Sequence, residues 1–305
     1  MENKLFAPNF HEADELLNDF LQEVKHWEGT LADGESILGP GATAITELKK
    51  SQINFGNPRD KLTLLTEATF KEFGTDLNSI YRQQMQDQYD FYYLTLQVAL
   101  IPGRTVQFWK LVCELDFGPK GEQEPILLSI FPYEKWRSVL KGEGGVDIGL
   151  IGLLGWIVGV DTSALEVIRA QMPGELQVDI TNKSDFKAVV TMPAYKYEFG
   201  YAEILATGVG ATARWNIKDK ALKKTGMVEF ATVFKVPKSV QELELTGTVW
   251  AEPNTNWLFS DVRDVAGELS DRFKQLFRNQ EEASRRLVRG VTKDWLLELP
   301  KAASV

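Results

Sequence analysis

The sequence predicts an α+β protein in which an antiparallel β-sandwich of about eight strands is flanked by amphipathic helices at its N- and C-terminal ends. Hydrophobic residues recur about every 3.6 positions before residue 89 and again after residue 259. Between these points the period is mostly two, as in half-buried strands. Gly- and Pro-containing turns, not helices, separate most of these runs, which favours antiparallel pairing over a parallel sheet with crossover helices.

The first 88 residues are predicted to form a helical N-terminal region. Residues 10–28 form an amphipathic helix with an acidic opposite face, and residues 29–58, which contain several Gly and Pro residues, form a loop. Residues 61–88 return to the helical period, with a break near Gly74. The apolar positions of the first helix are Leu16, Leu17, Phe20, Leu21, Val24 and Trp27.

Residues 89–258 are predicted to form the sandwich. A first strand ends at Pro102 and Gly103, a second alternates across 109–117, and a third covers 126–131. Alternation continues in 209–217 and 228–236, which ends before Pro237, and in 243–249. Further strands are expected in 176–180, 186–192 and 195–201.

Residues 259–305 are predicted to form a C-terminal helical region. Ser260 is the expected N-cap, Asp261 and Asp264 suit the positive end of the helix dipole, and Gly290 is expected to end or bend the helix. The region either docks on the sandwich or binds a partner or a second copy of the chain.

Composition limits the classes of partner and the location of the protein. The chain has 305 residues, of which 44% are hydrophobic, and its net charge of -9 disfavours nucleic-acid binding. Cys113 is the single cysteine, so an intramolecular disulfide is excluded, and the first residues do not resemble a secretory signal. We therefore expect a cytoplasmic protein.

The residues that usually carry catalysis are scarce. His11 and His26 lie about 22 Å apart on an unbroken helix, too far to share a metal ion. Cys113 falls on the apolar face of its strand, where a buried, inert thiol is expected. The Gly-rich stretch at 142–145 lacks the lysine and hydroxyl residue that end a phosphate-binding loop. We expect no catalytic residue, cofactor or metal, and favour a protein that is not an enzyme.

One segment, 142–160, departs from the usual composition of a soluble domain and lies in an apolar Gly-rich insertion at 142–175. Its glycines are spaced three or four apart, so a helix would present them on one flat face that another backbone can approach. Such a helix is weak in water and must be covered, either by the sandwich or by a membrane or partner protein. Its apolar run spans about 20 Å as a helix, short of the roughly 30 Å of a hydrocarbon core. The candidate contact residues are Gly149, Gly152, Leu154, Gly155, Trp156 and Gly159.

A second candidate surface is an aromatic ladder with period two. Its four rings project from one face of a predicted strand, where they either pack against the sheet or form a stacking platform for sugars or bases. The ladder consists of Tyr195, Tyr197, Phe199 and Tyr201.

These observations favour a non-enzymatic interaction or assembly protein that binds another protein or itself. The first alternative is a membrane-active effector, such as a pore-forming toxin or defence protein, that uses 142–160. The second is a hydrolase with paired acidic residues or a carbohydrate-binding module.

Overall fold

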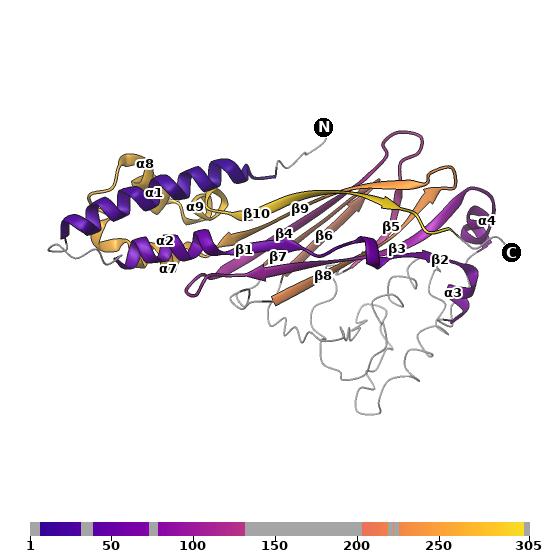
Figure 1. Ribbon diagram of the computed structural model, residues 1–305, viewed down its shortest axis with the longest axis horizontal. Coiled ribbons are helices and arrows are strands. Elements are labelled where there is room, and N and C mark those ends of the chain that lie inside the picture. Colours follow the sequence, from indigo (N-terminus) through magenta and orange to yellow (C-terminus); the bar gives the residue numbers. More distant parts are fainter. Residues whose placement is uncertain are drawn as a thin grey trace, which may run out of the picture.

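The computed structural model describes residues 7–31, 39–72, 79–131, 203–218, 222 and 226–301. These residues form helices and antiparallel strands arranged in two sheets, as the sequence predicts for the fold class. In Figure 1 the body is elongated, with α1, α2, α7, α8 and α9 grouped at one end and α3 and α4 toward the other. The strands run between the two groups.

The first sheet has the strand order β1-β3-β8-β5, and β2 also pairs with β3. Its central strands pair along almost their whole length, from Tyr89 opposite Pro237 to Leu100 opposite Gly226. The period-two alternation places every second residue of β3 in the core, from Tyr92 to Val98. The strands are β1 (Gln52–Phe55), β2 (Leu62–Leu65), β3 (Tyr89–Ile101), β5 (Ile126–Phe131) and β8 (Gly226–Pro237).

The second sheet has the order β10-β9-β4-β7-β6. Cys113 of β4 lies opposite Trp215 of β7 on one side and Val249 of β9 on the other, and all three are fully buried. The Trp215 ring centroid lies 4.8 Å from that of Phe230 in the first sheet, so the inner faces of the two sheets pack together. The strands are β4 (Phe108–Gly118), β6 (Glu203–Val209), β7 (Thr212–Lys218), β9 (Glu242–Pro253) and β10 (Arg289–Glu298).

The edges of the two sheets meet on both sides of the sandwich. On one side the backbone N–H of Leu127 donates to the carbonyl oxygen of Gly210 at 2.9 Å, which joins β5 to the β6–β7 turn. On the other side the rings of Phe55 in β1 and Trp295 in β10 meet edge to face, with centroids 5.3 Å apart. These contacts cover strand edges that would otherwise be open to pairing.

The N-terminal region contains more regular structure than its sequence suggests. The stretch 29–58, predicted as a loop, contains α2 (Pro40–Lys50) and β1. Pro40 suits the first turn of a helix because its fixed φ is already helical. Proline lacks a backbone N–H, and in the first turn this loses no hydrogen bond, because an N–H there has no acceptor within the helix. Glu28, from the end of α1 (Phe10–Leu31), accepts hydrogen bonds from the N–H groups of Gly41 and Ala42 at 2.8 and 3.1 Å.

The single broken helix predicted over 61–88 is wrong at its start. Residues 59–61 form the 3-10 helix η1 (Arg59–Lys61), and β2 follows and pairs with β3. The chain becomes helical only afterwards, in α3 (Glu67–Glu72) and α4 (Ser79–Asp87). Pairing with β3 buries Leu65, a contact that local periodicity does not reveal. The region assigned to 1–88 is therefore not purely helical, because β1 and β2 belong to the first sheet.

The C-terminal prediction is wrong in two respects. Ser260 is not an N-cap: it lies inside α7 (Thr255–Asp261), whose N-cap is Asn254. Three further helical elements follow, namely the 3-10 helix η3 (Arg263–Val265), α8 (Asp271–Arg278) and α9 (Gln280–Arg286). Gly290 does not end a helix, because residues 289–298 form β10, which pairs with β9 along its whole length. The region assigned to 259–305 is therefore only partly helical. The domain boundaries at 88 and 258 stay predictions.

The helices at this end pack on one another through aromatic rings, and an ion pair joins α1 to the sandwich. The rings of Phe20 in α1 and Phe273 in α8 stack with centroids 4.7 Å apart. Arg289, at the start of β10, forms an ion pair with Asp14 of α1. Segments from the two ends of the chain therefore share one body.

Candidate functional site

A groove of about 750 Å³ lies between the first helix and the C-terminal helices. One wall is formed by α1 and the two residues before it, and the other by α8, α9 and the residue before β10. The charged lining residues of the first wall are all acidic, and those of the second wall are all arginines. The lining residues are Pro8, Asn9, Glu12, Ala13, Glu15, Leu16, Asn18, Asp19, Arg272, Arg285, Arg286 and Val288.

The first wall is acidic because of the way α1 begins and packs. Asn9 caps the helix: its side-chain oxygen accepts from the N–H groups of His11 and Glu12 at 3.1 and 3.3 Å. The apolar stripe of α1 faces the core, so the opposite stripe carries Glu12, Glu15 and Asp19 into the groove. Their spacing of three and four places these carboxylates along one side of the helix.

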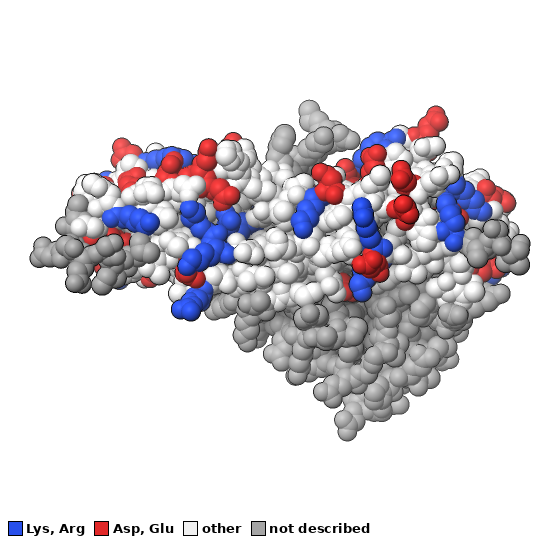
Figure 2. Space-filling model, viewed as in Figure 1, with Lys and Arg blue, Asp and Glu red and all other residues white. Residues whose placement is uncertain are grey.

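The second wall is basic. Arg272 of α8 crosses the groove to pair with Asp19 at 2.8 Å, and Arg285 of α9 pairs with Glu281 at 2.5 Å. Arg286 has no ion-pair or hydrogen-bond partner among the residues that the structure describes. In Figure 2 acidic and basic side chains lie close together over the helical end of the molecule.

The floor of the groove is apolar. Ala13, Leu16 and Val288 are at most 4% exposed, and Ala13 and Val288 belong to a small cluster with Val112 and Trp250 on the outer face of the second sheet. A ligand in the groove would therefore rest on hydrocarbon between two charged walls. This combination favours contacts that depend on the charge pattern and on shape.

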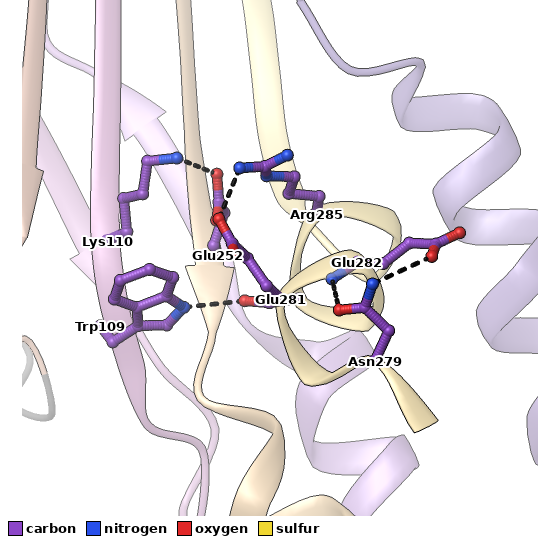
Figure 3. Close-up of polar contacts among 8 residues, drawn as sticks. Trp109, Lys110, Glu252, Asn279, Glu281, Glu282 and Arg285 are labelled. Atoms are coloured by element: carbon purple, nitrogen blue, oxygen red, sulfur yellow. Dashed lines mark hydrogen bonds and ion pairs between the residues drawn. The ribbon is translucent and has the colours of Figure 1, made fainter. Parts of the chain in front are cut away.

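A polar cluster fixes α9, and with it the basic wall, against the second sheet (Figure 3). The Trp109 indole N–H donates to the Ser284 hydroxyl at 2.8 Å, and that hydroxyl donates to the carbonyl oxygen of Pro253 at 2.6 Å. Beside this relay Lys110 pairs with Glu252 at 2.5 Å, with side chains only 13% and 4% exposed. The second carboxylate oxygen of Glu252 is buried without a hydrogen-bond partner in the described part of the chain.

None of the contact residues predicted from the sequence can be placed. The glycine-rich residues Gly149, Gly152, Leu154, Gly155, Trp156 and Gly159 lie outside the described residues, and so do the aromatic residues Tyr195, Tyr197, Phe199 and Tyr201. The expected contacts of both sets therefore stay predictions.

The scarce catalytic residue types are placed by the structure. Cys113 is fully buried, as predicted, and burial, with a smaller contribution from Glu114, raises the pKa of its thiol well above the usual value. His11 contacts Glu15 at 3.2 Å, and His26 lies beside Trp27. Over the described ranges, no three His, Cys, Asp or Glu side chains gather as a metal site. No helix in those ranges is both long and apolar enough to cross a membrane.

The groove itself was not predicted, although two signals pointed toward it. The acidic face of α1 is visible in the sequence, and binding of a partner or a second copy was one of two interpretations of the region after residue 259. Their juxtaposition is not visible, because Glu12 and Arg286 are 274 positions apart in the chain. Only the packing of α1 on α8 and β10 brings the two walls together.

Comparison with known proteins assigns no family. No protein-family model matches the chain, and no curated protein matches it. Among solved structures, the Clostridium perfringens delta-toxin aligns at a TM-score of 0.33 and 8% identity, over 67% of this chain and 78% of the toxin. A structure named as a pore forming protein aligns at 0.30 and 8%, over 67% and 78% of the two chains.

A collagen adhesin from S. aureus aligns more weakly. Its TM-score is 0.22 at 9% identity, over 54% of this chain and 38% of the adhesin. Likeness at this level transfers no function to this chain.

Proposed function

We propose that this chain is a non-enzymatic interaction or assembly protein and that it binds a protein partner in the groove between α1 and α8–α9. The observation that supports the proposal most directly is the construction of the groove, in which an acidic wall faces a basic wall over an apolar floor. A protein segment offers both charge signs and apolar atoms at once, whereas a simple anion or cation would be repelled by one wall.

The exposure of the charges indicates what they contribute. The side chains of Asp19 and Arg272 are 56% and 50% exposed, so each such pair supplies only about 0.2–1 kcal/mol. Exposed charges of this kind select a partner and speed its approach more than they hold it. We therefore expect binding to weaken markedly as salt is raised.

A photocrosslinking residue at Glu15 tests this proposal in cells that express the chain. The same residue at Glu298, which is exposed on β10 away from the groove, serves as the matched control. We expect a discrete covalent adduct from position 15 and none from position 298, with the attached protein identified by mass spectrometry. Equal adducts from both positions, or none from position 15, would contradict binding in the groove.

Self-association is the other form of this proposal, and the same adduct distinguishes it. A second copy of the chain in the adduct would indicate assembly, whereas a different protein would indicate a dedicated partner. Sedimentation of the purified chain at several concentrations provides the matching measurement. We also propose a cytoplasmic location, which cell fractionation tests directly.

A second candidate function is that of a membrane-active effector. One observation favours it: β5 ends at Phe131 and β6 begins at Glu203, yet the two strands are neighbours, because Leu127 of β5 bonds to Gly210 just after β6. Residues 132–202 connect these two strands in the sequence, and they contain the apolar Gly-rich run 142–160.

Leakage of dye from liposomes, with and without limited proteolysis of the protein, tests this second candidate. We expect leakage from the unmodified chain, its loss in Leu154→Asp and Gly155→Asp, and its retention in Leu154→Met. Leakage that survives both aspartate substitutions, or that never occurs under either condition, would exclude a role for the segment in membranes.

A further inference from the structure

The helix α4 lies toward the end of the sandwich opposite the groove (Figure 1). None of its nine residues is buried, whereas α2, of eleven residues, buries five. A helix as short as α4 is not stable in water by itself, so it forms only through its contacts. We infer that α4 is a releasable strap, which closes over Phe91 and Lys235 on the outer face of the first sheet and opens without disturbing the core. This device is independent of the groove and of the proposed interaction function.

The surface beneath α4 is more buried than α4 itself. Phe91 of β3 and Lys235 of β8 lie opposite each other in the first sheet and are 0% and 9% exposed. Their neighbours in sequence, Tyr92 and Phe234, point into the core, so Phe91 and Lys235 point outward. The Tyr81 ring of α4 meets the Phe91 ring edge to face with centroids 6.0 Å apart, which places α4 over this surface.

Closure of the strap leaves the Lys235 ammonium without a counter-ion. In the described part of the chain it forms no ion pair, and it donates to the uncharged side-chain oxygen of Gln84 in α4 at 2.9 Å. It also lies 4.6 Å from the centroid of the Tyr89 ring. Burial lowers the pKa of this ammonium, as expected for a cation removed from water without a carboxylate. Opening returns the charge to water and so recovers the free energy that its burial costs.

The other contacts of α4 that the structure describes lie near the surface or at its C-terminal end. Arg82 pairs with Glu67 of α3 at 3.1 Å, with side chains 37% and 38% exposed, and exposed pairs of this kind add little stability. The backbone N–H of Lys238 donates to the carbonyl oxygen of Gln88 at 3.0 Å, and its ammonium bonds to that of Gln86. These last two bonds hold the junction of α4 with β3, so they form the attachment about which the strap opens.

Hydrogen exchange of the full chain tests the opening. An amide in a locally opening segment exchanges through that opening, whereas an amide in a helix that belongs to the core requires a larger unfolding. After correction for intrinsic rates, we expect the amides of residues 83–87 to exchange about a hundredfold faster than those of residues 44–48 in α2. Equal exchange in the two helices would overturn the inference.

Gln84→Glu should hold the strap closed, because it places a carboxylate beside the Lys235 ammonium. A charge-assisted hydrogen bond is about twice as strong as a neutral one, and we expect exchange of residues 83–87 to slow about tenfold. Gln83→Glu adds the same charge at the neighbouring exposed position and is the matched control, in which the rate should not change. An unchanged rate in Gln84→Glu, or equal slowing in both variants, would contradict the strap.

Acylation of lysine amines separates release of the strap from fraying of α4 in place. A strap that opens uncovers Lys235, so an acylating reagent should modify it in the native protein, more slowly than the exposed Lys293. Gln84→Glu should slow this modification, located by mass spectrometry, about as much as it slows exchange. Fast exchange of α4 while Lys235 stays unmodified and Lys293 is fully modified would show fraying and refute the inference.

Discussion

Replacing Lys110 with Met is expected to destabilise the protein strongly, because it leaves Glu252 as a buried carboxylate without its cation. Glu252 is 3% exposed, one of its oxygens already lacks a hydrogen-bond partner, and its other oxygen meets Lys110 at 2.5 Å. Breaking a buried ion pair from one side costs about 3–5 kcal/mol. Because the Lys110 side chain is still 13% exposed, we expect the lower end, about 3 kcal/mol.

A double-mutant cycle in urea, followed by circular dichroism, measures this cost. Glu252→Leu combined with Lys110→Met removes both charges, so the double variant should recover most of the loss. Lys293→Met, at an exposed position of β10, is the control and should change the free energy of unfolding by less than about 0.5 kcal/mol. A loss below about 1 kcal/mol in Lys110→Met, or no recovery in the double variant, would refute the reasoning.

Three further predictions concern the core and the helical end. Gly290→Ala should lower the free energy of unfolding by about 1–3 kcal/mol in thermal melts, because a β-carbon there collides with the Phe10 ring and lies 2.6 Å from the carbonyl oxygen of Val249. Gly267→Ala, whose β-carbon meets no atom within 4 Å, is the control and should be tolerated. Trp215→Ala should cost about 3–5 kcal/mol in urea unfolding, against less than about 0.5 kcal/mol for Val209→Ala, which is 78% exposed. Burial raises the pKa of the Cys113 thiol, so a disulfide reagent should fail to label the native protein at pH 8 and should label it fully in urea; rapid labelling of the native protein would contradict the burial.

The polar cluster beneath α9 matters for the groove as well as for stability. Trp109, Ser284 and Pro253 hold the helix that carries Arg285 and Arg286. The hydrogen bond from Trp109 crosses from β4 to α9, so the basic wall of the groove is supported by the second sheet.

The strands of the sandwich were the most predictable part of the fold. Along β3, β4, β7 and β8 the apolar core residues recur at every second position of the sequence, and the same spacing placed Cys113 inside. The first helix was equally predictable, because the sequence of residues 10–28 shows both its apolar stripe and its acidic face.

The failures occurred where pairing with a distant strand outweighed local pattern. Val291 and Trp295 are four positions apart and fit one face of a helix as well as of a strand, and pairing with β9 decides for β10. Likewise, the spacing of Leu64 and Leu65 with later apolar residues predicted a helix, whereas pairing with β3 places both in a strand. Around Gly39, Pro40 and Gly41 the error was one of turn chemistry, because Pro at the first helical position begins a helix as readily as it ends one.

The sequence by itself determined the antiparallel sandwich, the amphipathic first helix and the buried cysteine, because each follows from the spacing of apolar residues within a dozen positions. Tertiary structure alone decided that both ends of the chain complete the sheets and that the acidic face of α1 lies opposite arginines of α8 and α9 across a groove. The physical reason is that local spacing records which face of a segment avoids water, whereas the partner that covers that face is chosen by contacts between residues far apart in the chain.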